Sequence, residues 1–266
     1  MDALLHRLPR EGRRRTQGPV TGSFRARAAA LAKLVELLLY PSFCRLCSEP
    51  LDEPGERVVC RACLGRLEAR RGASCSVCGR FFEGAGGDHA CARCLDVPPA
   101  FSLHRSCGAY GGALKDVILL FKYRKCAPLS RPLAAFAFEC TGGDPVLWDG
   151  ADLLVPVPLH PARRRERGFN QSRLLARDLA GLRGSRVLEG CLVKTRNVPP
   201  QAGLHAGERE TNVKGAYEVK RARRIAGKTL VLVDDVSTTG ATVRECARVL
   251  VEAGAKEVRV LTLARA

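Results

Sequence analysis

Eight of the 13 cysteines in this 266-residue chain have a spacing that could bind metal. They form four C-x-x-C pairs, and the interval between the two pairs is the same in each half of this region. Every cysteine of the second half follows its counterpart in the first at one constant offset, so this region is an internal repeat. The candidate ligands are Cys44, Cys47, Cys60 and Cys63 in the first repeat, and Cys75, Cys78, Cys91 and Cys94 in the second.

Two facing C-x-x-C turns bring four thiolates around one ion, which is the closed tetrahedron of structural zinc. We therefore predict two zinc ribbons with one structural Zn²⁺ each, paired within each repeat; cross-braced pairing is the alternative. A disulfide framework suits secreted chains, and we expect no cleavable signal segment here. A redox C-x-x-C would occur singly, near a thioredoxin-like strand and helix. The other cysteines are predicted to be small buried apolar residues: Cys107, Cys126, Cys140, Cys191 and Cys246.

A second candidate site follows a continuous apolar run at residues 229–233, which is typical of a buried strand. Residues 242–252 have helical periodicity, and residues 258–263 form another apolar run, so strand, loop, helix and strand predict a parallel sheet. A loop between such a strand and a helix offers free N–H groups and the positive end of the helix dipole to a phosphate. The loop residues are Asp234, Asp235, Val236, Ser237, Thr238, Thr239, Gly240, Ala241 and Thr242.

The composition of this loop indicates which phosphate it binds. Neither the P-loop motif nor the G-x-G-x-x-G fingerprint is present. Two adjacent carboxylates would repel a triphosphate, but they suit vicinal sugar hydroxyls or a Mg²⁺ ion that arrives with the ligand. We therefore predict a ribose 5-phosphate ligand. The alternative is that Asp234 and Asp235 only cap the loop as Asx turns.

The remaining chain supplies the elements that position these sites. Residues 1–27 contain seven Arg and no hydrophobic periodicity, which predicts a disordered basic arm, and a helix is expected from residue 28. The ribbons cover about 41–96, and Pro98-Pro99 marks a break. We predict a helix plus double zinc ribbon over 28–97 and an α/β domain over 98–266. Within that domain we expect helices around 114–121 and 175–182, strands within 151–159 and 188–196, and a mobile loop at 197–211.

Composition limits the classes of function. The 46% share of hydrophobic residues excludes disorder along the whole chain, and no apolar run approaches the ~20 residues of a membrane span. We therefore expect a soluble cytoplasmic protein that is not an integral membrane protein. The formal charge of +17 predicts a phosphate-rich partner, which is a nucleic acid or a phosphorylated small molecule.

The loop sequence LVLVDDVSTTGAT (230–242) resembles the 5-phosphoribosyl 1-pyrophosphate (PRPP) signature of type I phosphoribosyltransferases at all 13 positions. Three further segments resemble the ComF family, which joins a zinc-binding segment to such a domain and is associated with bacterial competence for DNA uptake. They are VPVPLHPARRRERGFNQSRLLA (155–176), FKYRKCAPLSRPLA (121–134) and the Q-x-x-L-x-x-x-x-R-x-x-N-x-x-G-A-Y array (201–217). The resemblance covers about 28–266 and matches the double-ribbon form of the family.

The resemblance implies roles for particular residues. Asp234 and Asp235 would bind the ribose hydroxyls, with Mg²⁺ accompanying PRPP, and residues 236–242 would hold the 5-phosphate. The loop after residues 155–158 would hold pyrophosphate through Arg163, Arg164, Arg165 and Arg167, whose guanidinium groups suit phosphate oxygens; the alternative is a basic face that contacts only nucleic acid. A flexible lid would contain Gln201, Arg209 and Asn212. Lys122 is a weaker candidate, equally explained as a cation at a helix end.

Three functions remain open at this point. The domain could be a phosphoribosyltransferase, a pentosyl glycosyltransferase that acts on an unidentified nitrogen acceptor, although no general base is evident. It could instead bind PRPP or a nucleotide as a sensor without turnover. It could also bind single-stranded DNA, because basic residues cluster at 101–133, 163–173 and 194–228. The resemblance favours a role in handling imported single-stranded DNA, with competence or recombination proteins as partners.

Overall fold

The computed structural model describes residues 42–51, 57–69, 72–83, 86–198 and 211–266. Residues 43–266 form one compact unit. The expected basic arm at 1–27 and the helix expected from residue 28 lie outside the described residues, as do the lid candidates Gln201 and Arg209.

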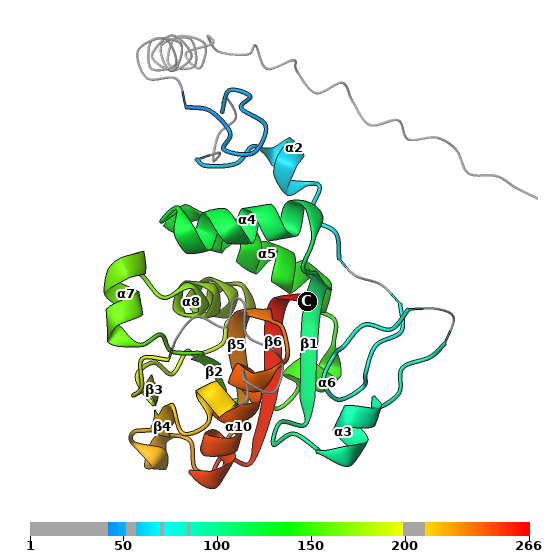
Figure 1. Cartoon of the computed structure of the whole chain (residues 1–266), viewed down its shortest axis with the longest axis vertical. Helices are drawn as coiled ribbons and strands as arrows, with labels where there is room; N and C mark the ends of the chain where they lie inside the picture. The colour runs from blue at the N-terminus through cyan, green and yellow to red at the C-terminus, as the bar shows by residue number, and fades with distance from the viewer. Residues whose placement is uncertain (1–41, 52–56, 70–71, 84–85, 199–210) are drawn as a thin grey trace, which may run out of the picture. The chain divides into compact units, whose positions relative to one another are not determined.

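A four-stranded parallel sheet lies at the centre of this unit, with the strand order β1-β6-β5-β2 (Figure 1). Its strands are β1 (Leu103–Ala109), β2 (Leu153–Pro156), β5 (Thr229–Ser237) and β6 (Glu257–Arg265). The two inner strands, β5 and β6, pair along their whole length, from Thr229 opposite Glu257 to Ser237 opposite Arg265. Their nearly unbroken burial explains the apolar runs in the sequence.

Alternate residues of β5 contribute to two apolar clusters, one on each face of the sheet. Val231 and Val233 belong to the cluster built with α4 (Gly112–Tyr123), α5 (Ser130–Thr141) and α8 (Gln171–Arg183). Leu230 and Leu232 belong to the other cluster, which includes residues of α10 (Ala241–Glu252) and of a small antiparallel sheet. That sheet consists of β3 (Leu192–Lys194) and β4 (Tyr217–Val219). The period of two residues along a strand therefore produces a three-layer α/β/α arrangement.

The predicted fold class is confirmed, but one strand boundary was wrong. The apolar run at 229–233 predicted a strand that ended before the carboxylates, whereas β5 continues to Ser237 because β6 is long enough to pair with it. The strand expected within 151–159 is β2, which ends before Pro158, a residue without the N–H that a ladder needs. The remaining short elements are α2 (Arg61–Leu64), α3 (Ala92–Asp96), η1 (Ala127–Leu129), α6 (Pro145–Trp148), α7 (Pro161–Arg167) and η2 (Ala222–Arg224).

The two cysteine repeats have the same local structure. Each contains a turn closed by one antiparallel bridge, Phe43 with Pro50 in the first repeat and Ser74 with Phe81 in the second. Each then has a short helix that starts immediately after a cysteine ligand candidate, α2 after Cys60 and α3 after Cys91. The constant offset between the repeats therefore relates whole supersecondary units.

At one equivalent position the two repeats have different residues in the same backbone conformation. Ser48 and Gly79 both have φ = +64°, in the left-handed region that favours glycine. At Gly79 glycine is also required by packing, because a Cβ there would lie 2.4 Å from the backbone oxygen of His104 in β1. The second turn also bonds to this strand, since the N–H of His104 donates to the carbonyl of Val77 at 2.8 Å.

We expect exchanges at these two equivalent positions to have opposite effects. Ser48→Gly should raise the free energy of unfolding by roughly 0.5 to 1 kcal/mol, because it removes left-handed strain from a residue with a Cβ. Gly79→Ser should lower it by about 2 kcal/mol or more, since strain and the contact with His104 act together. Denaturant unfolding of the zinc-loaded protein measures both. Equal effects at the two positions would contradict this account of the repeat.

Candidate phosphate site and zinc centres

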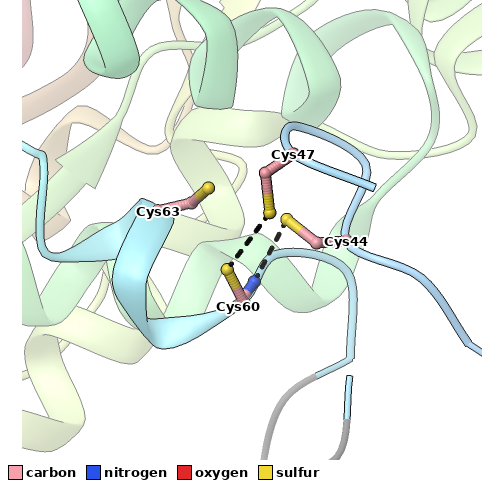
Figure 2. Close-up of side chains that lie close together, drawn as sticks. All are labelled: Cys44, Cys47, Cys60 and Cys63. Atoms are coloured by element: carbon pink, nitrogen blue, oxygen red, sulfur yellow. Dashed lines mark hydrogen bonds between the residues drawn. The ribbon is translucent and has the colours of Figure 1, made fainter. Parts of the chain in front are cut away.

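The eight predicted ligands form two separate clusters, each within one repeat. One contains Cys44, Cys47, Cys60 and Cys63, and the other contains Cys75, Cys78, Cys91 and Cys94; in each, all four sulfurs lie within 4.8 Å of one another. Figure 2 shows the first cluster, whose side chains come from the turn and from α2 with the residue before it. The Sγ atoms are 3.6 Å apart for Cys47 and Cys60, and 3.8 Å apart for Cys78 and Cys91. A zinc–sulfur bond of about 2.3 Å in a tetrahedron requires about 3.8 Å.

In each cluster, peptide groups favour the thiolate of one cysteine. Burial opposes ionisation of Cys44, but N–H groups that include those of Cys60 and Leu46 outweigh it and lower the pKa of Cys44 to about 6. At Cys75 burial is likewise outweighed, by N–H groups that include those of Cys78 and Cys91, and the pKa of Cys75 is also lowered to about 6. The donor set therefore fits two structural zinc ions, and the pairing within each repeat is the predicted one.

The cysteines outside these clusters are mostly buried, as expected. Cys107, Cys126, Cys191 and Cys246 are buried, whereas Cys140 is half-buried. A side-chain hydrogen bond to Cys140, together with burial, raises the pKa of the Cys107 thiol well above its usual range. These residues contribute to packing.

The predicted phosphate loop lies at the carboxyl end of β5. Gly240 has φ = +81° and precedes the first residue of α10, so the chain turns sharply from the loop into the helix. A small hollow is lined by the loop residues Asp234, Val236, Ser237, Thr238, Gly240, Ala241 and Thr242 together with Val243. Ser237 is buried and Thr238 and Thr239 are half-buried. Backbone N–H groups at the start of a 12-residue helix thus face a hollow of hydroxyl side chains.

The two carboxylates beside the hollow have separate long-range partners. Asp235 forms an ion pair with Lys122 of α4, with the Nζ and Oδ1 atoms 2.8 Å apart. Asp234 accepts a hydrogen bond of 2.8 Å from the Ser172 hydroxyl of α8. Each carboxylate also accepts a bond from the following backbone N–H. The capping that the alternative explanation requires is therefore present, but capping does not explain the long-range partners.

Electrostatics distinguish these two carboxyl groups. Burial and the adjacent Asp235 raise the pKa of Asp234 to about 6, against the opposing effects of Lys122 and Ser172. Burial of the Lys122 ammonium is outweighed by the two carboxylates, so the pKa of Lys122 is raised and the ion pair stays charged. Lys122 is therefore part of the site, and the explanation as a helix-end cation was incomplete.

The segment Gly168–Phe169–Asn170–Gln171–Ser172 holds this arrangement, and sequence reasoning gave none of these residues a role. Gly168 ends α7 at φ = +86°, and the Asn170 side chain caps α8 by accepting from the N–H groups of Ser172 and Arg173. Asn170 also donates to the carbonyl of Val157 beyond β2, at 3.0 Å. Their position inside the ComF-like segment at 155–176 was the only sequence signal.

The four candidate arginines were predicted to lie in a loop, but they lie on α7. A proline at the first position and the His160 side chain as cap start this helix. Arg163 and Arg167 are half-buried, whereas Arg164 and Arg165 are exposed. Arg163 pairs with Glu166 at 2.8 Å, and Arg167 bonds to Gln171 and lies 5.3 Å from the centre of the Tyr123 ring. The structure thus divides the predicted set into two pairs.

Lys194 at the end of β3 is a further cation that sequence reasoning missed. Burial lowers the pKa of Lys194, and Arg163 and Arg167 lower it further, whereas Asp234 acts in the opposite sense. Its ammonium lies 5.2 Å from the centre of the Tyr217 ring. Lys194 therefore interacts electrostatically with the two half-buried arginines of α7, Arg163 and Arg167, and with the loop carboxylate Asp234.

The last residue of the array at 201–217, Tyr217, contacts the phosphate loop. Tyr217 is buried, and its side chain shares a hydrogen bond with Thr242 of the loop. Asn212 is half-buried, and its backbone carbonyl accepts from Arg196 at 3.2 Å. The lid role of Asn212 is untested.

Comparisons with known proteins agree with the two-part organisation of the chain. A family model described as "Double zinc ribbon domain" matches residues 35–95, and one described as "Phosphoribosyl transferase domain" matches residues 192–266. "DNA utilization protein YhgH" of Salmonella typhimurium is 31% identical over 86% of this chain and 99% of its own length. "Competence protein ComFC" of Bacillus subtilis is 31% identical over 81% of this chain and 87% of its own, and "Competence protein F" of Haemophilus influenzae is 28% identical over 78% and 96%.

Fold and site together define a protein with a double zinc ribbon and a phosphoribosyltransferase-like domain. Because relatives over 30% identical align along almost their whole length, the chain belongs to the ComF family. Within the described residues, no helix combines the length and apolar character needed to cross a lipid bilayer.

The raised pKa of Asp234 predicts a pH-dependent effect of Asp234→Asn. The folded pKa of about 6 exceeds the ordinary value of 3.8, so the folded state holds this proton more tightly than the unfolded state. Stability contributed by this group is therefore lost as pH rises from about 4 to about 6, and stays lost above it. We expect Asp234→Asn to raise the free energy of unfolding by on the order of 1 kcal/mol at pH 8 and to change it little at pH 4.5.

Asp235→Asn is the matched control in the same denaturant titrations. This variant leaves the Lys122 ammonium buried without its partner, so we expect a loss of about 3 kcal/mol at pH 8. If both variants change stability in the same direction at pH 8, the different roles assigned to the two carboxylates are wrong.

Proposed function

We propose that this chain binds PRPP or ribose 5-phosphate in the loop that follows β5. The observation that carries the proposal is the placement of Asp234 and Asp235 directly before a hydroxyl-rich hollow at the start of α10. The hollow suits the 5-phosphate, since helix N-terminal N–H groups and the Ser and Thr hydroxyls are donors. The carboxylates suit the vicinal ribose hydroxyls that follow.

The cations near the carboxylates suit the other end of the ligand. Lys194 interacts electrostatically with Asp234 and with Arg163 and Arg167, and these three cations would stabilise pyrophosphate oxygens. Mg²⁺ would enter with PRPP and neutralise part of the diphosphate charge. Asp234, held as a partly protonated acid when the site is free, would ionise when a cation arrives.

We infer a biological setting from the names of the relatives. "Competence protein ComFC" and "DNA utilization protein YhgH" suggest that this chain handles imported single-stranded DNA in the cytoplasm, together with competence or recombination proteins. Exposed Arg164 and Arg165 on α7 support a nucleic-acid surface beside the ligand site. We also propose domain limits of 28–97 and 98–266, with residues 1–27 as a basic arm.

Two alternatives use the same loop. In an active phosphoribosyltransferase, the bond from C1 of the ribose to pyrophosphate would break as a nitrogen nucleophile attacks, and the cations would stabilise the departing pyrophosphate. In a sensor, PRPP or a nucleotide would bind without bond breakage. The lid candidates Gln201, Arg209 and Asn212 would exclude water in either case.

We expect calorimetric titration with Mg·PRPP to show one site in the zinc-loaded protein. The double variant Asp234→Ala and Asp235→Ala should weaken binding by roughly a hundredfold or more, because two charged hydrogen-bond acceptors are lost, while two zinc ions per chain remain. Unchanged affinity would refute the assignment of the loop. Pyrophosphate released only when a base or nucleotide is added would identify an enzyme, and binding without release would identify the sensor.

The division of the α7 arginines predicts separable effects on PRPP and DNA. We expect Arg167→Glu to weaken Mg·PRPP at least tenfold, and Arg165→Glu to leave it within about twofold, because Arg167 is half-buried and acts on Lys194, whereas Arg165 is exposed. Both should weaken a short single strand, and the affinity for that strand should fall steeply with salt. If Arg165→Glu has no effect on the strand, α7 is not a DNA surface.

A further inference from the structure

The penultimate residue of the chain, Arg265, lies buried between the second cysteine cluster and the phosphate loop. Its side chain belongs to the end of β6, and only 6% of the residue is exposed. One terminal nitrogen donates to the Ser237 hydroxyl at 3.2 Å and lies 3.3 Å from Nδ1 of His104, and the other lies 3.8 Å from Sγ of Cys78. A single guanidinium thus contacts a zinc-ligand sulfur and the hydroxyl that begins the loop.

The charge of Arg265 has no carboxylate to balance it among the interactions described for this residue. Burial and nearby Arg105 keep His104 neutral by lowering its pKa, and Arg265 acts in the same sense. The opposite charge near Arg265 belongs to the cysteine cluster, because four thiolates and one Zn²⁺ have a net charge of −2. A buried cation is stable only when it is paired, so the guanidinium depends on the metal-loaded cluster.

Two more arginines connect the second ribbon to the loop and its helix. Arg93, on α3 beside the ligand Cys94, donates to the backbone carbonyl of Thr239 in the loop at 3.1 Å. Arg244, on the first turn of α10, donates to the carbonyl of Val97 at 3.0 Å and lies 3.5 Å from Sγ of Cys94. The second ribbon is therefore connected to the phosphate loop at Ser237 and Thr239, and to the first turn of α10 at Arg244.

The first cluster also has an arginine, for which the interactions described in the structure include no such connection. Arg66 lies 3.4 Å from Sγ of Cys63, but it is exposed and belongs to the same ribbon. The N–H groups that donate to the Cys44 sulfur also belong to ribbon residues, namely Leu46 and Cys60. The two repeats thus share a metal geometry but differ in their connection to the phosphate loop.

We propose that zinc in the second cluster holds the phosphate loop in its binding geometry through Arg265, supported by Arg93 and Arg244, whereas zinc in the first cluster does not. Arg265 is a positioning residue, and the second zinc ion is part of the ligand site although it does not touch the ligand. Loss of this ion releases the Cys78 sulfur that the guanidinium contacts, so Arg265 is no longer held beside Ser237.

Hydrogen exchange of the loop amides tests this proposal without any ligand. Cys91→Ser and its repeat equivalent Cys60→Ser each remove one ligand, and neither sulfur has a described hydrogen bond with Arg265. With one zinc ion remaining in each variant, we expect exchange of residues 237–241 to accelerate at least tenfold in Cys91→Ser and less than twofold in Cys60→Ser. Equal acceleration in both variants, or none in Cys91→Ser, overturns the proposal.

Variants of Arg265 and Arg93 remove the contacts with the loop while both zinc ions stay bound, so they separate the effect of the contacts from that of the metal. With two zinc ions bound, Arg265→Gln should accelerate loop exchange as Cys91→Ser does, Arg265→Lys should restore part of the protection, and Arg66→Gln should have no effect. If Arg265→Gln does not fold, Arg93→Gln provides the same test at a half-buried position. A loop unaffected by the loss of either arginine overturns the proposal.

Ligand linkage provides a second readout, which rests on the proposed function. In the ¹¹³Cd-loaded protein, saturating ribose 5-phosphate should shift the resonance of the second cluster and leave that of the first unchanged. It should also raise the cadmium affinity of the second cluster about tenfold in equilibrium competition with a chelator, because coupling between the affinities of two sites is reciprocal. Calorimetry on the same sample shows whether ribose 5-phosphate binds. Absence of binding refutes the proposed function, while hydrogen exchange still decides the connection between zinc and loop.

Discussion

Two adjacent carboxylates at the carboxyl end of a buried strand impose the constraint on which the site depends. Such charges repel each other and lose hydration, so the fold must supply compensation from elements that are distant in sequence. Lys122 comes from α4 and Ser172 from α8, and the helix cap at Asn170 sets where Ser172 lies. The helices on this face of the sheet therefore complete the cores that cover β5 and also hold its polar end.

The sequence predicted the parts of the fold that follow from local pattern. The apolar runs of β5 and β6 and the periodicity of α4 and α10 identified a parallel α/β domain, and the constant offset between the cysteine pairs identified two equivalent ribbons. The limits of β5 were not predictable from its own residues. Its polar end stays in the sheet because β6 pairs with it as far as Arg265, and that partner is set by tertiary structure.

The site, too, has parts that follow from local sequence pattern and parts that only tertiary structure determines. The loop residues could be found because their types and order suit a phosphate, but their supports could not. Ser172 lies 62 residues from Asp234 in the chain, and Lys194 is an isolated lysine at the end of a three-residue strand. Arg265 lies in the last strand, where sequence pattern predicts only burial. Such roles depend on which strand ends meet at one edge of the sheet.

The internal repeat shows that equal local structure can have unequal consequences. Both ribbons have the same ligand spacing and the same left-handed turn at Ser48 and Gly79. Only the second must have glycine there, because its turn lies against the backbone of β1, and that close contact places Cys78 beside Arg265. A duplicated metal unit can therefore serve two purposes, because the residues that surround its sulfurs, rather than the sulfurs themselves, decide what the metal stabilises.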